Sequence, residues 1–135
     1  MLPKLVTPEQ ERHRDKLSGA ALRGFFGIAK AWGLTDAESR ILLGNPSRTT
    51  FYRWKQNQEG ALSKDELERI SYLLGIFKAL NILFVSPEQA DGWIRRPNAA
   101  PLFGGMTALD RMLAGNVADL FVVREYLDAQ RGGWA

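Results

Sequence analysis

The chain has no cysteine, a single histidine and no long run of apolar residues among its 135 residues. Without cysteine it has neither disulfides nor thiolate metal ligands, and His13 alone cannot complete a zinc site. The apolar stretches fall well short of the about 20 residues that a membrane-spanning helix needs. Charges at positions 9–16 do not fit a signal peptide. We therefore expect a cytoplasmic protein with no metal ion, no cofactor and no membrane association.

Residues suited to catalysis are few and poorly placed. Without cysteine, a nucleophilic serine or threonine would need His13 as its base, and His13 is better explained as a surface residue. Gly104-Gly105 is too short to cradle a phosphate group. The acidic residues fit helix caps and solvated helix faces: Asp65, Glu66, Glu68, Asp110 and Asp119. We expect that the chain is not an enzyme.

The charge is distributed unevenly. The whole chain has a net charge of +3, but residues 1–60 carry ten Lys/Arg against six Asp/Glu, and residues 61–135 carry eight against nine. Between Arg40 and Lys55 there are four basic residues and no acidic residue. This local excess favours a polyanionic partner such as nucleic acid. A solvated surface with a chance asymmetry of charge explains it equally well.

Helix signals recur along the chain, whereas the alternation typical of strands is scarce. Hydroxyl side chains followed by Pro or by Glu or Gln mark helix starts at 7–10, 35–38, 63–66 and 86–89. Spacing predicts one helix from residue 8 and others over 18–32, 36–43, 47–56, 64–84, 87–95 and 107–114, with a last one from 117. Two prolines and two glycines predict a loop from Arg96 to Gly105. The sequence therefore predicts an all-α fold.

The predicted helices fall into two units with a seam near residues 60–66. We expect one unit over residues 1–62 and a second over residues 63–135. The long helix 64–84 joins them, and it has enough apolar positions to serve the core and a dimer surface together.

Two short helices, 36–43 and 47–56, are separated by the tight turn Gly44-Asn45-Pro46. This is the layout of a helix-turn-helix, whose second helix enters the major groove of DNA. Phe51 and Trp54 lie three residues apart and would anchor that helix to the core. The candidate DNA-binding residues are the polar ones around them: Ser47, Arg48, Thr49, Thr50, Tyr52, Arg53 and Lys55. A plain helical corner is the alternative.

The position of each residue in the second helix suggests its role. The first turn of a recognition helix lies deepest in the groove, so Arg48 and Thr49, with Tyr52, would contact base edges. Arg53 and Lys55 fit better as phosphate contacts, which fix register. Ser47 would cap the helix. Since such helices usually bind paired half-sites as dimers, we expect a homodimer.

The spacing of residue types indicates less about the function of the C-terminal half. The loop at 95–105 is long for a connection inside a compact helical domain, and such loops often carry function. The terminal residues Gly132-Gly133-Trp134-Ala135 place a large aromatic after two glycines. That ending is either a frayed tail or an anchor for a partner's pocket.

Several ordered motifs in this chain resemble those of antitoxins of the Xre/MbcA/ParS type, the partners of RES-domain toxins. The resemblance extends over about residues 34–133. The motifs are Leu42-Leu43-Gly44, Thr50-Phe51-Tyr52-Arg53-Trp54, the segments 68–76, 79–84 and 90–98, Phe103-Gly104-Gly105, and Val123-Arg124-Glu125-Tyr126-Leu127. Thr107-Ala108 departs from the serine-proline pair more often found there, but Thr107 still caps a helix. The first 30 residues match weakly, and their role is open.

The resemblance implies an N-terminal Xre-like domain that binds promoter DNA and autoregulates its operon. It also implies a C-terminal domain that neutralises a RES-domain toxin, an NAD-consuming protein similar to ADP-ribosyltransferases, by covering its active site. On this basis the toxin-binding residues are in the loop, namely Arg95, Arg96, Asn98 and Phe103, and in the terminal segment, namely Arg131, Gly132, Gly133 and Trp134. Arginine suits phosphate-binding surroundings and tryptophan can stack, so this segment is suited to a nucleotide cleft.

Two other functions are compatible with the same residues. One is a free-standing dimeric helix-turn-helix repressor whose C-terminal half only dimerises. The other is an adaptor with no role on DNA. A neighbouring reading frame that encodes a RES-type protein would favour the antitoxin over both.

Overall fold

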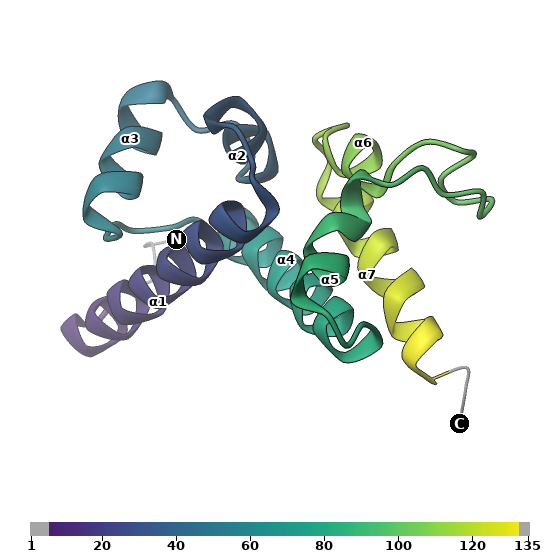
Figure 1. Cartoon of the computed structure of the whole chain (residues 1–135). Helices are drawn as coiled ribbons and strands as arrows, with labels where there is room; N and C mark the ends of the chain where they lie inside the picture. The colour runs from purple at the N-terminus through teal and green to yellow at the C-terminus, as the bar shows by residue number, and fades with distance from the viewer. Residues whose placement is uncertain (1–5, 133–135) are drawn as a thin grey trace, which may run out of the picture.

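Helices account for nearly all the regular structure of the chain (Figure 1). The structure, a computed structural model, describes residues 6–132. Within these residues there are seven α-helices and one 3-10 helix: α1 (Pro8–Trp32), α2 (Asp36–Leu42), α3 (Arg48–Asn57), α4 (Lys64–Leu83), α5 (Pro87–Gly92), η1 (Trp93–Arg95), α6 (Ala108–Met112) and α7 (Val117–Gly132). The same residues contain no β-strand, only an isolated bridge between Pro97 and Thr107. The prediction of an all-α fold is confirmed.

The helix starts are set by local side-chain caps. Thr35 and Glu38 form a reciprocal capping box at α2, as do Ser63 and Glu66 at α4. These caps satisfy backbone N–H groups that have no partner inside the helix. The predicted bounds of the helices after residue 35 agree with the structure to within about two residues, which is the usual uncertainty of helix ends.

The prediction of two separate helices before residue 33 is wrong, because α1 runs unbroken from Pro8 to Trp32. Ser18 was expected to begin the second helix. Instead it is buried inside α1, and its Oγ accepts a hydrogen bond from the Leu62 backbone N–H at 3.1 Å. No proline follows Pro8 in this stretch, so nothing interrupts the backbone hydrogen bonds.

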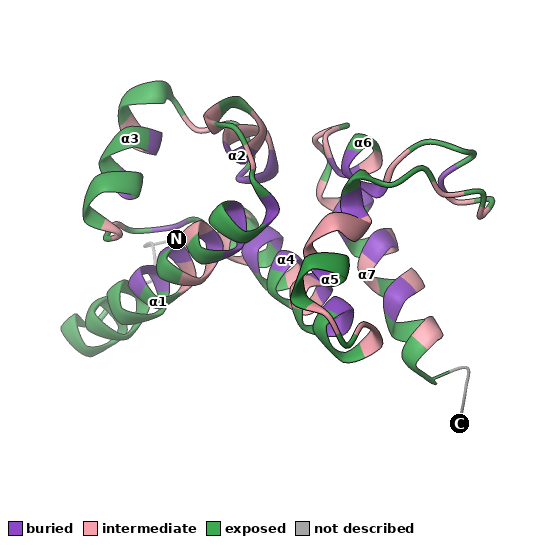
Figure 2. Cartoon of the chain, in the orientation of Figure 1, coloured by how far each residue is buried: buried purple, intermediate pink, exposed green. Residues whose placement is uncertain are grey.

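Helix α4 is the centre of the molecule. It packs against α1 in the N-terminal half and against α7 in the C-terminal half. Its buried residues are Arg69, Ile70, Leu73, Ile76, Ala79 and Leu80. Fully burying a leucine or isoleucine side chain contributes about 1.5–3 kcal/mol, so this helix holds both halves on one hydrophobic core (Figure 2). Among the described residues, no helix combines the length and apolarity that crossing a bilayer requires.

Arg69 reinforces the junction between the halves. The residue is only 9% exposed. Its guanidinium donates from Nε to Asp65 Oδ2 at 2.8 Å and from Nη2 to the Gly115 carbonyl at 3.0 Å. It also packs against Gly44, where an added Cβ would lie 3.1 Å from Arg69 Nε. One guanidinium therefore contacts the turn after α2, helix α4 and the turn before α7.

Gly60 provides a stability test for the segment that follows α3. Its φ is 154°, and an added Cβ would lie 2.5 Å from Nε1 of the buried Trp54. Backbone strain and the displaced indole should make Gly60→Ala less stable by about 2–4 kcal/mol in denaturant unfolding. Gly27→Ala is the matched control: it is inside α1 with no neighbour within 4 Å, and should gain about 0.5–1 kcal/mol. Equal stability of the two variants would contradict this description of Gly60.

Candidate functional site

The turn between α2 and α3 is fixed by backbone and arginine hydrogen bonds. Gly44 and Asn45 both have positive φ, at 91° and 62°, and asparagine is among the few non-glycine residues that adopt this conformation readily. The Asn45 N–H donates to the Arg40 carbonyl at 2.7 Å. Arg40 in turn donates from Nε and Nη2 to the Pro46 carbonyl at 3.2 and 3.0 Å. The turn therefore holds α2 and α3 in a defined helix-turn-helix geometry.

The first turn of α3 is capped by two hydroxyl groups. The Thr50 N–H donates to Ser47 Oγ at 3.2 Å, and the Ser47 hydroxyl donates to Thr50 Oγ1 at 3.0 Å. Ser47 is therefore the N-cap, as the sequence predicted. Arg48 and Thr49 follow directly and are exposed, at the end of the helix where backbone N–H groups favour anions.

Opposite faces of α3 differ in burial. Phe51 is fully buried and Trp54 nearly so, and the Phe51 ring centroid lies 5.8 Å from that of Phe26 on α1. The outer face is exposed along its length in Figure 2. It carries Arg48, Thr49, Tyr52, Arg53 and Lys55, with no acidic residue between Ser47 and Gln58. The structure thus brings these predicted polar residues together on one exposed face of α3, a helix that has no acidic residue of its own.

Lys55 has an acidic partner on α2. Its Nζ lies 2.7 Å from Asp36 Oδ1, and this hydrogen bond is the main reason that the pKa of Asp36 is lowered. The contribution of this contact is therefore present above the ordinary pKa of an aspartate and is lost as the pH falls through the lowered pKa of Asp36. Both side chains are about half exposed, so the pair adds little to stability. No local sequence pattern indicates this contact, which joins residues 19 positions apart.

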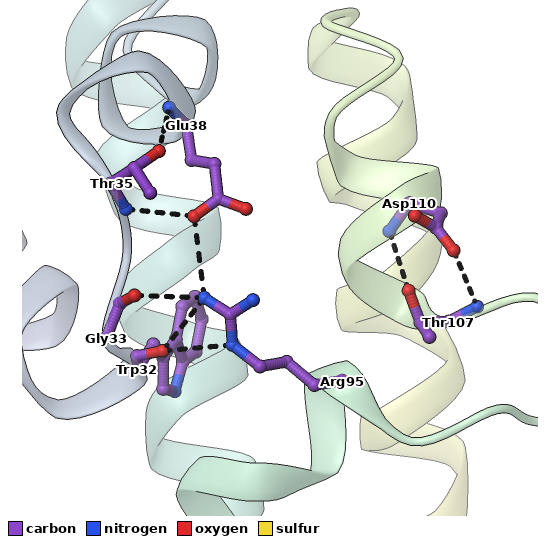
Figure 3. Close-up of polar contacts among 7 residues, drawn as sticks. All are labelled: Trp32, Gly33, Thr35, Glu38, Arg95, Thr107 and Asp110. Carbon is purple, nitrogen blue, oxygen red and sulfur yellow. Dashed lines mark hydrogen bonds and ion pairs between the residues drawn. The ribbon is translucent and has the colours of Figure 1, made fainter.

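The loop 96–106 is shaped by Asn98. The Asn98 N–H donates to the Met106 carbonyl at 2.9 Å, and the Gly105 N–H donates to the Asn98 carbonyl at 2.8 Å. The Asn98 side chain accepts from the Ala100 N–H at 2.9 Å. A capping box between Thr107 and Asp110 then begins α6 (Figure 3). These bonds give the predicted loop a fixed conformation.

Phe103 belongs to this loop, but its side chain is buried under the loop and not exposed on its surface. It is 4% exposed, and its ring centroid lies 5.8 Å from that of Trp93 and 5.2 Å from that of Tyr126. Both contacts are edge-on, an arrangement that aromatic rings prefer. Because its ring is buried, Phe103 can affect partner recognition only by holding the loop in its conformation.

Arg95 and Arg96 point to acceptors within the chain. Arg95 donates from Nε and Nη2 to the Trp32 carbonyl at 3.3 and 3.2 Å, and from Nη2 to the Gly33 carbonyl at 3.0 Å and to Glu38 Oε1 at 3.4 Å (Figure 3). Arg96 donates from Nη2 to the Gln89 carbonyl at 2.9 Å. Its guanidinium carbon lies 5.7 Å from the centroid of the Phe84 ring.

The predicted terminal segment is described only in part. Arg131 is exposed at the end of α7, with Nη1 3.7 Å from Asp128 Oδ1, and Gly132 is the last residue of the helix. Gly133 and Trp134 lie outside the described residues. The structure therefore places Arg131 and Gly132 on the last turn of α7.

Two segments of the chain match protein families. Residues 11–75 match the antitoxin Xre-like helix-turn-helix domain, and residues 79–133 match the antitoxin Xre/MbcA/ParS C-terminal toxin-binding domain. A helix-turn-helix half joined to a toxin-binding half defines an antitoxin. The chain belongs to the Xre-type antitoxins, as its motifs predicted.

A curated protein is similar to this chain over most of its length. The protein named "Uncharacterized protein y4oB" of Sinorhizobium fredii is 53% identical over 114 residues, which cover 84% of this chain and 86% of the relative. The helix-turn-helix match begins at residue 11, so it includes most of α1. Residues 11–30, whose role the sequence motifs left open, thus belong to the domain, and α1 supplies Leu22, Phe25 and Trp32 to its core.

Proposed function

We propose that this antitoxin neutralises a RES-domain toxin by covering its NAD-consuming active site, and represses its own operon by binding promoter DNA. It would act as a homodimer in the cytoplasm. The observation that carries the DNA-binding part is the exposed, acid-free outer face of α3, which is held by a fixed turn on one side and by Phe51 and Trp54 on the other.

On DNA, we assign the first turn of α3 to the major groove. Arg48 is exposed there and has the length to reach a guanine edge with two hydrogen bonds, with Thr49 and Tyr52 beside it. Arg53 and Lys55 would contact phosphates. The hydroxyls of Ser47 and Thr50 are engaged in the cap, so they would act by orienting the helix N-terminus toward a phosphate.

Asp36→Asn tests the role of Lys55. In wild type Asp36 competes with the phosphate for Lys55 Nζ. Removing the carboxylate should therefore give about threefold tighter binding to mixed-sequence DNA at 0.15 M salt and a salt slope steeper by up to about 0.9. Fluorescence anisotropy over a salt series measures both. Glu125→Gln on α7 removes the same charge from the other half and should change neither. Unaltered affinity and slope in Asp36→Asn would mean that Lys55 does not reach a phosphate.

For the toxin, we assign loop 96–106 and the terminal segment as the parts of the chain that contact it. Arg96, Asn98, Arg131, Gly132, Gly133 and Trp134 would make the contacts, while Arg95 and Phe103 would act through the position of the loop. The fixed conformation of this loop supports the assignment, because a preorganised surface loses less conformational entropy on binding.

Co-expression with a RES-domain toxin from the adjoining reading frame tests the toxin-binding function. We expect rescue of growth, co-purification and loss of NAD consumption by the purified complex. A chain that lacks residues 131–135 should leave much of the NAD consumption intact. Full inhibition of the toxin by the truncated chain would show that the terminal segment is not needed to cover the active site. If the toxin neither co-purifies nor is inhibited while the promoter is still bound, the chain is a free-standing repressor.

We also propose that residues 1–62 form the DNA-binding unit and residues 63–135 the dimerisation and toxin-binding unit, with α4 serving both. Leu17 and Leu74 are large apolar side chains, half-exposed in a groove between α1 and α4. A second copy of the chain that buries this groove would give the paired recognition helices that half-sites require. Sedimentation equilibrium should give a dimer for wild type and a monomer for Leu17→Glu; a monomeric wild type would exclude this arrangement.

A further inference from the structure

The C-terminal end of α1 and the N-terminal end of α2 share one arginine from the other half of the chain. The α1 helix ends at Trp32 with Gly33 as its C-cap, and the carbonyls of these two residues are acceptors at the negative end of the helix dipole. Arg95 donates to both, at 3.0–3.3 Å. This guanidinium thus supplies donors that the helix itself lacks.

Arg95 also reaches the cap of α2. Glu38 Oε1 accepts from the Thr35 N–H at 2.9 Å and from Arg95 Nη2 at 3.4 Å (Figure 3). The capping carboxylate therefore joins the α2 backbone to η1. The residues that meet at this point are 57–63 positions apart in sequence.

Helix α2 is therefore held at both ends by arginines that follow residue 62. Arg95 holds its first turn, and Arg69 packs against Gly44 in the turn that leads to α3. Since α2 and that turn set the direction of α3, a shift of α2 would move the exposed face of the recognition helix.

We propose that Arg95 is a positioning residue for DNA binding, acting from the toxin-binding half of the chain. This inference rests on the proposed DNA-binding function of α3. Arg95 itself touches no DNA. It fixes the angle between α1 and α2 by its planar fork of donors, a geometry that lysine cannot reproduce. Because the loop 96–106 begins at the next residue, the same contact connects the two binding faces.

Arg95→Ala and Arg95→Lys are compared with Arg111→Ala to separate this role from others. Arg111 is an arginine of similar exposure that bonds only within the C-terminal half, to Asp119 Oδ1 and the Leu102 carbonyl, so Arg111→Ala is the matched control for DNA binding. For Arg95→Ala we expect about fivefold to tenfold weaker binding to the promoter fragment, a size typical of coupling between distant sites. The salt slope should stay unchanged, because no phosphate contact is removed. Arg95→Lys should bind with intermediate affinity.

Hydrogen exchange provides a second measurement that does not depend on DNA. In Arg95→Ala the amides of residues 35–42 should exchange faster than in wild type, while those of α7 stay unchanged. All affinities are taken below the unfolding range, where each variant is more than about 99% folded by circular dichroism.

The outcomes are distinguishable. Wild-type affinity and wild-type exchange in Arg95→Ala would overturn the inference. A reduced salt slope in Arg95→Ala would show that Arg95 contacts a phosphate directly and would overturn the inference. Reduced toxin affinity with unchanged DNA affinity would show that Arg95 contacts the toxin directly, and would also overturn it. If wild type binds no DNA, the proposed function of α3 fails, and faster exchange in α2 alone would still support Arg95 as the residue that positions it.

Discussion

Arg48→Ala is expected to bind the operon's promoter fragment about 5- to 150-fold more weakly than wild type, equivalent to about 1–3 kcal/mol. Arg48 occupies the first turn of α3, exposed beside the Ser47 cap. Its bidentate contact to guanine would be lost, so discrimination between sequences should relax at one base pair. Competition between promoter and mixed-sequence DNA in a mobility-shift assay measures this change.

Two further variants define the limits of that result. Arg53→Ala should weaken binding to all sequences alike and lower the salt slope by about 1, as expected for a phosphate contact. Arg111→Ala removes one partly exposed cation from α6, outside both the helix-turn-helix and the groove between α1 and α4, and should bind as wild type. If Arg48→Ala and Arg53→Ala both shift the promoter as wild type does, α3 is not the recognition helix.

Phe103→Ala is expected to lower the free energy of unfolding by about 3–5 kcal/mol, as for other buried phenylalanines. The ring is 4% exposed and packs edge-on against Trp93 and Tyr126, so its removal leaves a cavity under the loop. Whole domains are stable by only about 5–15 kcal/mol. The loss would therefore be a large part of the total, and toxin affinity should fall with it.

Phe121→Ala is the matched control for Phe103→Ala. Phe121 is the same residue type on α7, but it is 41% exposed and pairs with Tyr72 near the surface. We expect it to cost less than about 2 kcal/mol, since truncation there leaves no closed cavity. Urea unfolding of both variants gives the comparison. Similar losses for the two would show that the aromatic cluster under the loop is not part of the core.

The helix starts could be predicted from sequence because their causes are local. Thr35 with Glu38 and Ser63 with Glu66 form capping boxes within four residues, so sequence spacing contains the whole interaction. Ser18 shows the limit of this reasoning. Spacing predicts that a second helix begins at this residue, but its hydroxyl accepts from the Leu62 N–H, 44 residues away, and the helix continues through it. Only the packing of α1 against the segment before α4 decides between these roles.

The same distinction applies to the candidate site. The two faces of α3 follow from the spacing of Phe51 and Trp54, so the exposed basic face could be predicted. The partners of Arg95, Lys55 and Phe103 lie on other elements, at sequence separations that no local pattern encodes. Arginines in a loop look alike in sequence, and only the fold shows that Arg95 faces the end of α1.

The position of α4 restricts how such antitoxins can exchange parts during evolution. The two family matches meet between residues 75 and 79, which is inside this helix. One stretch of its sequence must fit α1 and α7 together, and Arg69 on it also contacts Gly44 and Gly115. A chimera that joins the DNA-binding half of one relative to the toxin-binding half of another would mismatch one side of α4. Operator preference and toxin preference should therefore be inherited as one unit, and lineages should diverge in both at once.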